Sequence, residues 1–139
     1  MAQATRTPGP GTTIKDALAA TLITSAAHAA DVAVAWVQVD RPSSVVVVTT
    51  LGAISSDVSA TDIEIVGADD TSGTNTVSYG HFDAIGPSDD SQTRYLEAVV
   101  HKPYMGAILD LTRSGSGTVV AGVKVHAIEH LARSNTRTA

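Results

Sequence analysis

The chain has 139 residues, a length that suits one domain with a hydrophobic core of its own. Hydrophobic residues make up 43% of it and aromatic residues 4%, which excludes disorder of the whole chain and predicts a core of Val, Ile, Leu and Ala. The net charge of −5 argues against nucleic-acid binding by the domain body, and the absence of cysteine excludes disulfides and thiolate metal sites.

The N-terminal part of the sequence divides into an arm and an ambiguous segment. Two prolines and two glycines disfavour regular structure in residues 1–13, so we expect an extended N-terminal arm. Residues 14–30 mix Ala with β-branched residues, and we favour a strand at Thr21–Ser25. The run 17–29 looks like a secretory leader, but Asp16 at its head and its Thr and Ser content argue against a cleaved signal peptide.

The rest of the chain alternates strand-like segments with turn chemistry. We predict strands at Val32–Val39, Val45–Leu51, Ser59–Val66, Thr76–Phe82, Gln92–Val100, Tyr104–Thr112 and Thr118–Ile128. The turns between them are rich in Asp, Gly, Ser and Pro. About seven or eight strands spaced in this way predict an all-β fold, an antiparallel β-sandwich or jelly-roll-like body over residues 14–130. Residues 131–139 are predicted to form a C-terminal tail, a second extended arm.

Two neighbouring segments show what kind of surface this fold carries. The β-branched apolar run Val45–Ile54 suits a strand buried on both faces. The next strand alternates, with Asp62 and Glu64 on one face and Ile63 and Ile65 on the other, which suits a strand with one wet face. These patterns build a surface and no active site, so we expect a structural or binding protein and not an enzyme.

The histidines offer one metal-like spacing. His126 and His130 are four residues apart with Glu129 between them, and on a helix such a pair could bind zinc. The pair follows a valine-rich strand, and the Glu stands in the wrong place for the zincin pattern. We therefore expect surface histidines here.

Other candidate sites are also explained by turn geometry. The oxygen-rich loops Asp69–Asn75 and Asp89–Asp90 lack the EF-hand spacing. Gly115–Gly117 is too short for a phosphate loop, since no Gly-Lys-Ser/Thr and no helix follow it. There is no Gly-x-Ser-x-Gly nucleophile elbow. We expect no catalytic residue, no metal and no cofactor.

The aromatic residues lie on separate predicted strands: Trp36, Tyr79, Phe82, Tyr95 and Tyr104. This distribution is more typical of core or interface anchors than of a ligand cage. They are not interleaved with Lys and Arg, as a platform for single-stranded nucleic acid would require. A sugar-binding module would have to rely on Trp36, Tyr79 and Tyr104.

Several segments together resemble a family of small tailed-bacteriophage virion proteins. They combine a Gly-x-Ile segment after a valine-rich strand, an acidic turn, a Tyr-containing strand and a Ser-Gly hairpin before a second valine-rich strand. These segments are Leu51–Asp57, Ile63–Gly73, Arg94–Val100 and Leu109–Gly117. The sequence departs from the family pattern in two places. The acidic turn reads Asp-Asp-Thr-Ser-Gly, and Tyr104-Met-Gly stands where the family usually has a Tyr-hydrophobic-Arg strand.

The resemblance implies a capsid decoration or cement protein on the virion surface, assembled in the host cytoplasm. Its partners would be the major capsid protein and other copies of itself, with a trimer possible at shell threefold positions. No nucleic-acid or membrane partner is implied. The alternatives are a tail-tube, head–tail connector or head-fibre component, or a host-surface carbohydrate-binding module.

Overall fold

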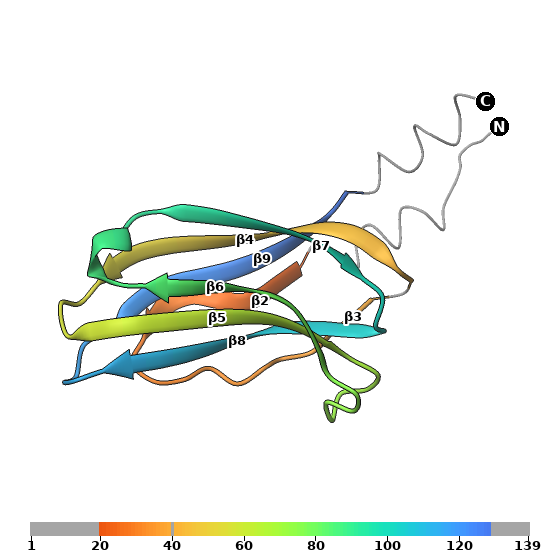
Figure 1. Cartoon of the computed structure of the whole chain (residues 1–139), viewed down its shortest axis with the longest axis horizontal. Helices are drawn as coiled ribbons and strands as arrows, with labels where there is room; N and C mark the ends of the chain where they lie inside the picture. The colour runs from red at the N-terminus through yellow and green to blue at the C-terminus, as the bar shows by residue number, and fades with distance from the viewer. Residues whose placement is uncertain (1–19, 40, 129–139) are drawn as a thin grey trace.

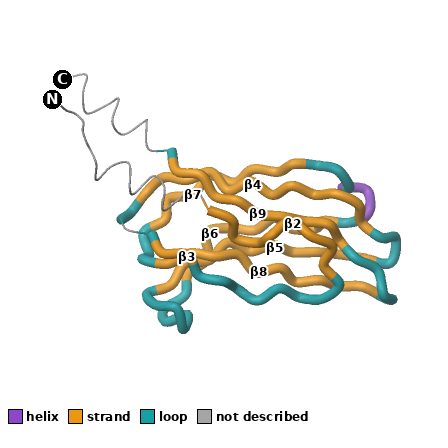
Figure 2. Tube along the Cα trace, turned by 180° about the vertical axis from the view of Figure 1, so that it is seen from behind, coloured by secondary structure: helices purple, strands orange, loops and turns teal. Residues whose placement is uncertain are grey.

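The computed structural model describes residues 20–39 and 41–128, and the regular structure of this part is almost entirely β-strand, as Figure 1 and Figure 2 show. Eight strands follow one another in the described residues, with one short 3₁₀ helix, η1 (Pro87–Asp89), before β7. The strands are β2 (Ala20–His28), β3 (Val37–Gln38), β4 (Ser43–Ile54), β5 (Val58–Ala68), β6 (Val77–Ile85), β7 (Thr93–Val100), β8 (Tyr104–Arg113) and β9 (Val119–Ala127). The predicted all-β sandwich is confirmed. The arms predicted at residues 1–13 and 131–139 lie outside the described residues.

The strands form two four-stranded antiparallel sheets. The first sheet has the order β2-β9-β4-β7 and the second has the order β3-β8-β5-β6. Four of the pairings are those of one long hairpin that turns between β5 and β6. They join β2 with β9, β3 with β8, β4 with β7 and β5 with β6. Successive pairs of this hairpin fall alternately in the first and second sheets, which is the wrapping of an eight-stranded jelly roll.

The core lies between the sheets and is aliphatic, as the composition predicts. Phe82 is the one aromatic side chain among the buried core residues of the described part. Each fully buried aliphatic side chain contributes about 1.5–3 kcal/mol to folding. The largest fully buried side chains are Ile63, Ile65, Ile85, Met105, Leu109, Val45, Val47, Val58, Val100, Val119 and Val123.

Strand β4 corrects one prediction. Its valines alternate, with Val45 and Val47 fully buried and Val46 and Val48 only partly buried, so the strand is not buried on both faces. The reason is that the second sheet covers one face of the first sheet only. The alternation predicted for β5 is confirmed, because Ile63 is buried between the sheets while Asp62 and Glu64 are partly exposed.

The strand predicted over residues 32–39 is much shorter in the structure. Its pairing with β8 is limited to an isolated bridge between Val32 and Leu109 and to the two residues of β3, where Val37 lies opposite Met105. Five residue steps separate Val32 from Val37, but four separate Leu109 from Met105. The extra residue interrupts the ladder as a bulge does.

Two turns that cross between the sheets are joined at one end of the sandwich (Figure 1). Asp57, between β4 and β5, accepts hydrogen bonds from the backbone N–H of Gly117 through its carboxylate (2.8 Å) and of Ser114 through its carbonyl (3.0 Å). Ser55 accepts one from the N–H of Thr118 (3.0 Å). A β-carbon at Gly117 would collide with the Asp57 carboxylate, so the turn between β8 and β9 requires glycine there.

Candidate interaction surface

The acidic loop between β5 and β6 is held together by its own carboxylates. Asp70 accepts hydrogen bonds from the Thr74 hydroxyl (2.7 Å) and from two backbone amides of the loop. Asp69 accepts one from Asn75 (2.7 Å) and one from the Lys102 ammonium group (2.9 Å). These bonds lower both pKa values, chiefly through Asn75 and then Lys102 for Asp69, and through Thr74 for Asp70. All four carboxylate oxygens are therefore engaged, three within the loop and one with Lys102 in the turn between β7 and β8.

The polar groups of the second acidic loop and of the glycine-rich hairpin also form contacts that stabilise the fold. Asp89 forms a salt bridge with Arg94 (3.0 Å) and accepts a hydrogen bond from the N–H of Gly86 (2.8 Å). The N–H of Gly117 faces the Asp57 carboxylate, which occupies the place that an anionic ligand would take. Within residues 20–39 and 41–128, no group of three or more His, Asp or Glu side chains is placed to hold a metal ion.

The histidines are dispersed over the sandwich. His126 lies on β9, so the helix that a zinc-binding pair with His130 requires has not begun at His126, and His130 itself lies outside the described residues. His81 joins two carboxylates on the outer face of the second sheet. Its Nδ1 lies 3.0 Å from Asp62 and its Nε2 lies 3.4 Å from Glu64, an arrangement that the sequence did not indicate.

Tyr79 has a structural place that sequence reasoning missed. Its ring crosses β5 above Gly67, where an added β-carbon would lie 2.5 Å from the Tyr79 hydroxyl oxygen. That oxygen accepts hydrogen bonds from the backbone N–H groups of His101 (3.3 Å) and Lys102 (3.2 Å) in the turn between β7 and β8. The Tyr79 and His101 rings meet edge to face at 5.6 Å. This tyrosine joins the second sheet to a turn that links the two sheets.

The other aromatic side chains differ in exposure. Phe82 is buried, and Trp36 and Tyr104 are half-buried. Tyr95 on β7 is 69% exposed and Val99, four residues along the same strand, is 63% exposed. These two are the exposed large hydrophobic side chains of the described residues, and both lie on the outer face of the first sheet, away from the core.

The strand register places further residues on this outer face. Half-buried valines of β4 form its centre, with β7 on one side and β9 on the other. Two rows cross it, one of Tyr95, Val48 and Lys124 and one of Glu97, Val46 and His126. We call these six residues, together with Val99, the outer face. The charged and imidazole groups of Glu97, Lys124 and His126 form no salt bridge within the part of the chain that the structure describes.

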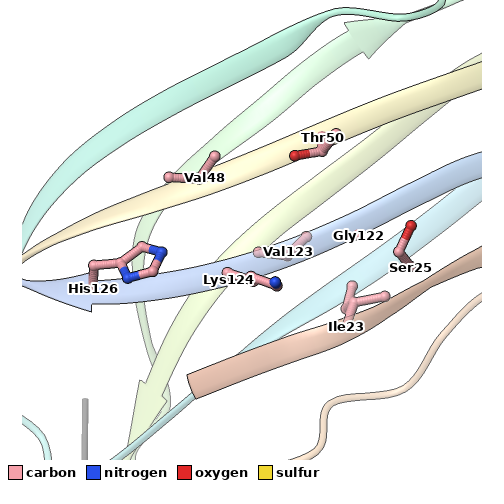
Figure 3. Close-up of a pocket in the computed structure, with 8 residues that line it drawn as sticks. All are labelled: Ile23, Ser25, Val48, Thr50, Gly122, Val123, Lys124 and His126. Carbon is pink, nitrogen blue, oxygen red and sulfur yellow. The ribbon is translucent and has the colours of Figure 1, made fainter. Parts of the chain in front are cut away.

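A groove of about 270 Å³ opens on this face between β2, β9 and β4 (Figure 3). Its lining includes Gly122, over which β2 runs so close that a β-carbon at Gly122 would lie 2.8 Å from that of Ser25. The groove combines apolar walls with a cationic side chain. Its lining residues are Ile23, Ser25, Val48, Thr50, Gly122, Val123, Lys124 and His126.

The sequence contained a partial signal for this surface. The strand Gln92–Val100 was predicted to alternate, and alternation places Tyr95, Glu97 and Val99 on one face. Which face looks outward, and which residues of β4 and β9 lie beside it, depends on sheet order, and sheet order is a long-range property. The groove depends further on the approach of β2 to Gly122, which no local pattern indicates.

Comparison with known proteins adds no assignment, since no protein-family model matches the chain and no curated protein matches its sequence. In the described ranges, no helix has the length and apolar character needed to cross a membrane.

Proposed function

We propose that this chain is a virion structural protein that binds the outside of a phage capsid and stabilises it. The observation that carries the proposal is a jelly-roll body that presents exposed Tyr95 and Val99 on its outer face, while its acidic loops and its glycine-rich hairpin are engaged in structural contacts. Jelly rolls recur among viral capsid domains. The resemblance of four of its segments to small tailed-bacteriophage virion proteins supports the same function.

The mechanism would be mechanical. Each copy would bind across neighbouring capsid subunits, so that its binding free energy opposes their separation. Repetition of modest contacts over many sites would add avidity. Residues 1–13 and 131–139 would act as clamps that add a strand to the shell or fill a groove in it. The major capsid protein would then be the principal partner.

Cosedimentation of the purified chain with undecorated phage capsids tests the proposal. Saturation at a fixed high number of copies per shell is the expected result. Deletion of residues 1–13 should leave the thermal unfolding midpoint unchanged but abolish binding to shells. Retained binding by this truncation would remove the clamp role of the arm. Binding of a few copies per particle would instead favour a tail-tube, connector or head-fibre position.

A host-surface carbohydrate-binding module is the candidate from a different class, and one observation favours it. Tyr95 is exposed on the outer face that carries the groove, and sugars pack on exposed aromatic rings. Trp36, one of the three aromatic residues that the sequence offers for such a module, is half-buried. Glycan-array binding that is lost in Tyr95→Ala or in Trp36→Ala would support this module over the virion role.

A further inference from the structure

We propose that the outer face of the first sheet is the contact between two copies of this chain, packed about a twofold axis that runs parallel to β4. In this pairing Tyr95 of each copy lies over Lys124 at the wall of the other copy's groove. The proposal concerns the sandwich body alone and can be tested without capsid shells, because it assigns the outer face to a second copy and leaves the terminal arms to bind the shell.

The outer face has the composition of a contact surface. Its centre is formed by Val46 and Val48, and Tyr95 and Val99 project from β7 with most of their surface exposed. An exposed tyrosine supplies a large contact area for little loss of conformational entropy, which is why tyrosine is enriched among the residues that dominate binding energy. The outer face of the second sheet differs, because Asp62, Glu64 and His81 lie there.

The order of the strands makes the face complementary to itself. β4 is flanked by β7 on one side and β9 on the other. A twofold rotation about an axis along β4 brings the outer faces of the two copies together. It exchanges the positions of β7 and β9, so that β7 of one copy lies over β9 of the other. The same patch then serves on both copies, as a twofold contact requires. Aligned sheets pack in this way with strands within about 30° of each other.

Charge selects this axis over the alternative. With the axis along β4, the row of Glu97, Val46 and His126 packs on the same row of the other copy in the opposite order. Glu97 therefore faces the imidazole of the other copy's His126. The neighbouring row brings the Lys124 ammonium group over the ring of Tyr95, a favourable cation–π arrangement. An axis at right angles to the strands would place β7 over β7 and β9 over β9, which gathers like charges on each side.

The groove supplies a place for the projecting ring. The register places Tyr95 level with Val48 and Lys124, and both of these residues line the groove. After the rotation, Tyr95 of the second copy therefore lies over Lys124 on β9, beside Val48, at the wall of the groove. Figure 3 shows Lys124 on β9, with β4 and β2 on either side.

The area of the face sets the strength of the contact. About this axis three strands, β9, β4 and β7, overlap their copies, and a spacing of about 4.8 Å with a rise of about 3.4 Å per residue along β7 gives a face of roughly 400 Å². Two copies would bury about 800 Å² in total, which is below the standard size and suits a weak, transient interface. The dimer should therefore be weak, with a Kd on the order of 10 μM. It differs from the trimer that the resemblance suggests.

The first test is sedimentation equilibrium of the full chain from about 1 μM to about 500 μM, a range chosen around this Kd. A reversible monomer–dimer equilibrium is expected. Tyr95→Ala should weaken it by about tenfold or more, because each dimer loses two exposed aromatic rings from the contact. The matched control is Thr112→Ala, an exposed position on β8 of the second sheet, which should leave the Kd unchanged. A monomer throughout the range, or an unchanged Kd for Tyr95→Ala, would overturn the pairing.

A mixing experiment separates contact between copies from contact within one copy. His126→Glu places two carboxylates together in its own homodimer, and Glu97→Lys removes the carboxylate that faces His126, so each variant alone should associate more weakly than the wild-type chain. A mixture of the two should dimerise, because one contact of the heterodimer becomes Lys with Glu and the other is the native pair. No association in the mixture would refute the axis. If the wild-type chain is monomeric but Tyr95→Ala loses binding to shells, the face belongs to the shell and the pairing is wrong.

Discussion

Replacement of Thr49 by Val should stabilise this protein. Thr49 on β4 is completely buried, and its hydroxyl has no hydrogen-bond partner; the same holds for Thr61 on β5. A buried hydroxyl without a partner costs about 1–3 kcal/mol relative to an apolar group, because it loses its water and gains nothing in return. Valine has the same branched shape and favours strands equally well, so the change removes this cost without opening a cavity.

The expected gain for Thr49→Val is about 1–2 kcal/mol in the free energy of unfolding. For a chain of this size, that gain raises the thermal midpoint by about 3–8 °C. Urea denaturation and calorimetry would measure both quantities. The control is Thr50→Val, one residue along, where the side chain is exposed and the change should stay within about 0.5 kcal/mol. A lower unfolding free energy for Thr49→Val would show that the hydroxyl has a partner and would refute the reasoning.

Other predictions follow from the contacts between loops and strands. Tyr79→Phe leaves two turn amides without their acceptor and should cost about 1–2 kcal/mol, whereas Gly67→Ala also displaces the ring and should cost more, both measured by urea denaturation. Asp57→Ala removes the acceptor that joins the two crossing turns and should cost about 1–3 kcal/mol by the same assay. The pKa values of Asp69 and Asp70 are held below the ordinary value of about 3.9, so their contribution to the loop is present above that pH and is lost as pH falls through the lowered pKa values. The protection factors of amides in the loop between β5 and β6, which are exchange rates corrected for the intrinsic rate at each pH, should therefore fall on acidification below about pH 4, and unchanged protection factors would contradict the assignment.

The class of fold could be predicted from the sequence because its determinants are local. Alternation of buried and exposed residues, as in Ile63 and Ile65 against Asp62 and Glu64, depends only on the geometry of a strand. The turn between β5 and β6 was equally readable, since Asp70 accepts hydrogen bonds from groups within four residues of it. The aliphatic core followed from a composition with few aromatic residues.

The errors arose where a distant segment decides the outcome. The run of valines from Val45 to Val48 reads as a strand buried on both faces, but only one face of the first sheet meets the second sheet. The alternating residues 32–39 read as a long strand, yet one extra residue relative to β8 interrupts their pairing. Neither outcome can be obtained from the segment alone, because both depend on the register between strands far apart in the sequence.

The two outer faces of the sandwich indicate where such a protein makes contacts. On the second sheet, Asp62 lies opposite Asp110 across two strands, a like-charge pair that is tolerated where water screens it. His81 beside Asp62 adds a further polar group to that face. On the first sheet, Tyr95 and Val99 remain exposed beside half-buried valines, and burial of that apolar area is favourable at about 25 cal/mol per Å². Removal of water by a partner therefore lowers the free energy at the outer face of the first sheet and raises it at that of the second sheet. This difference directs association to the first sheet.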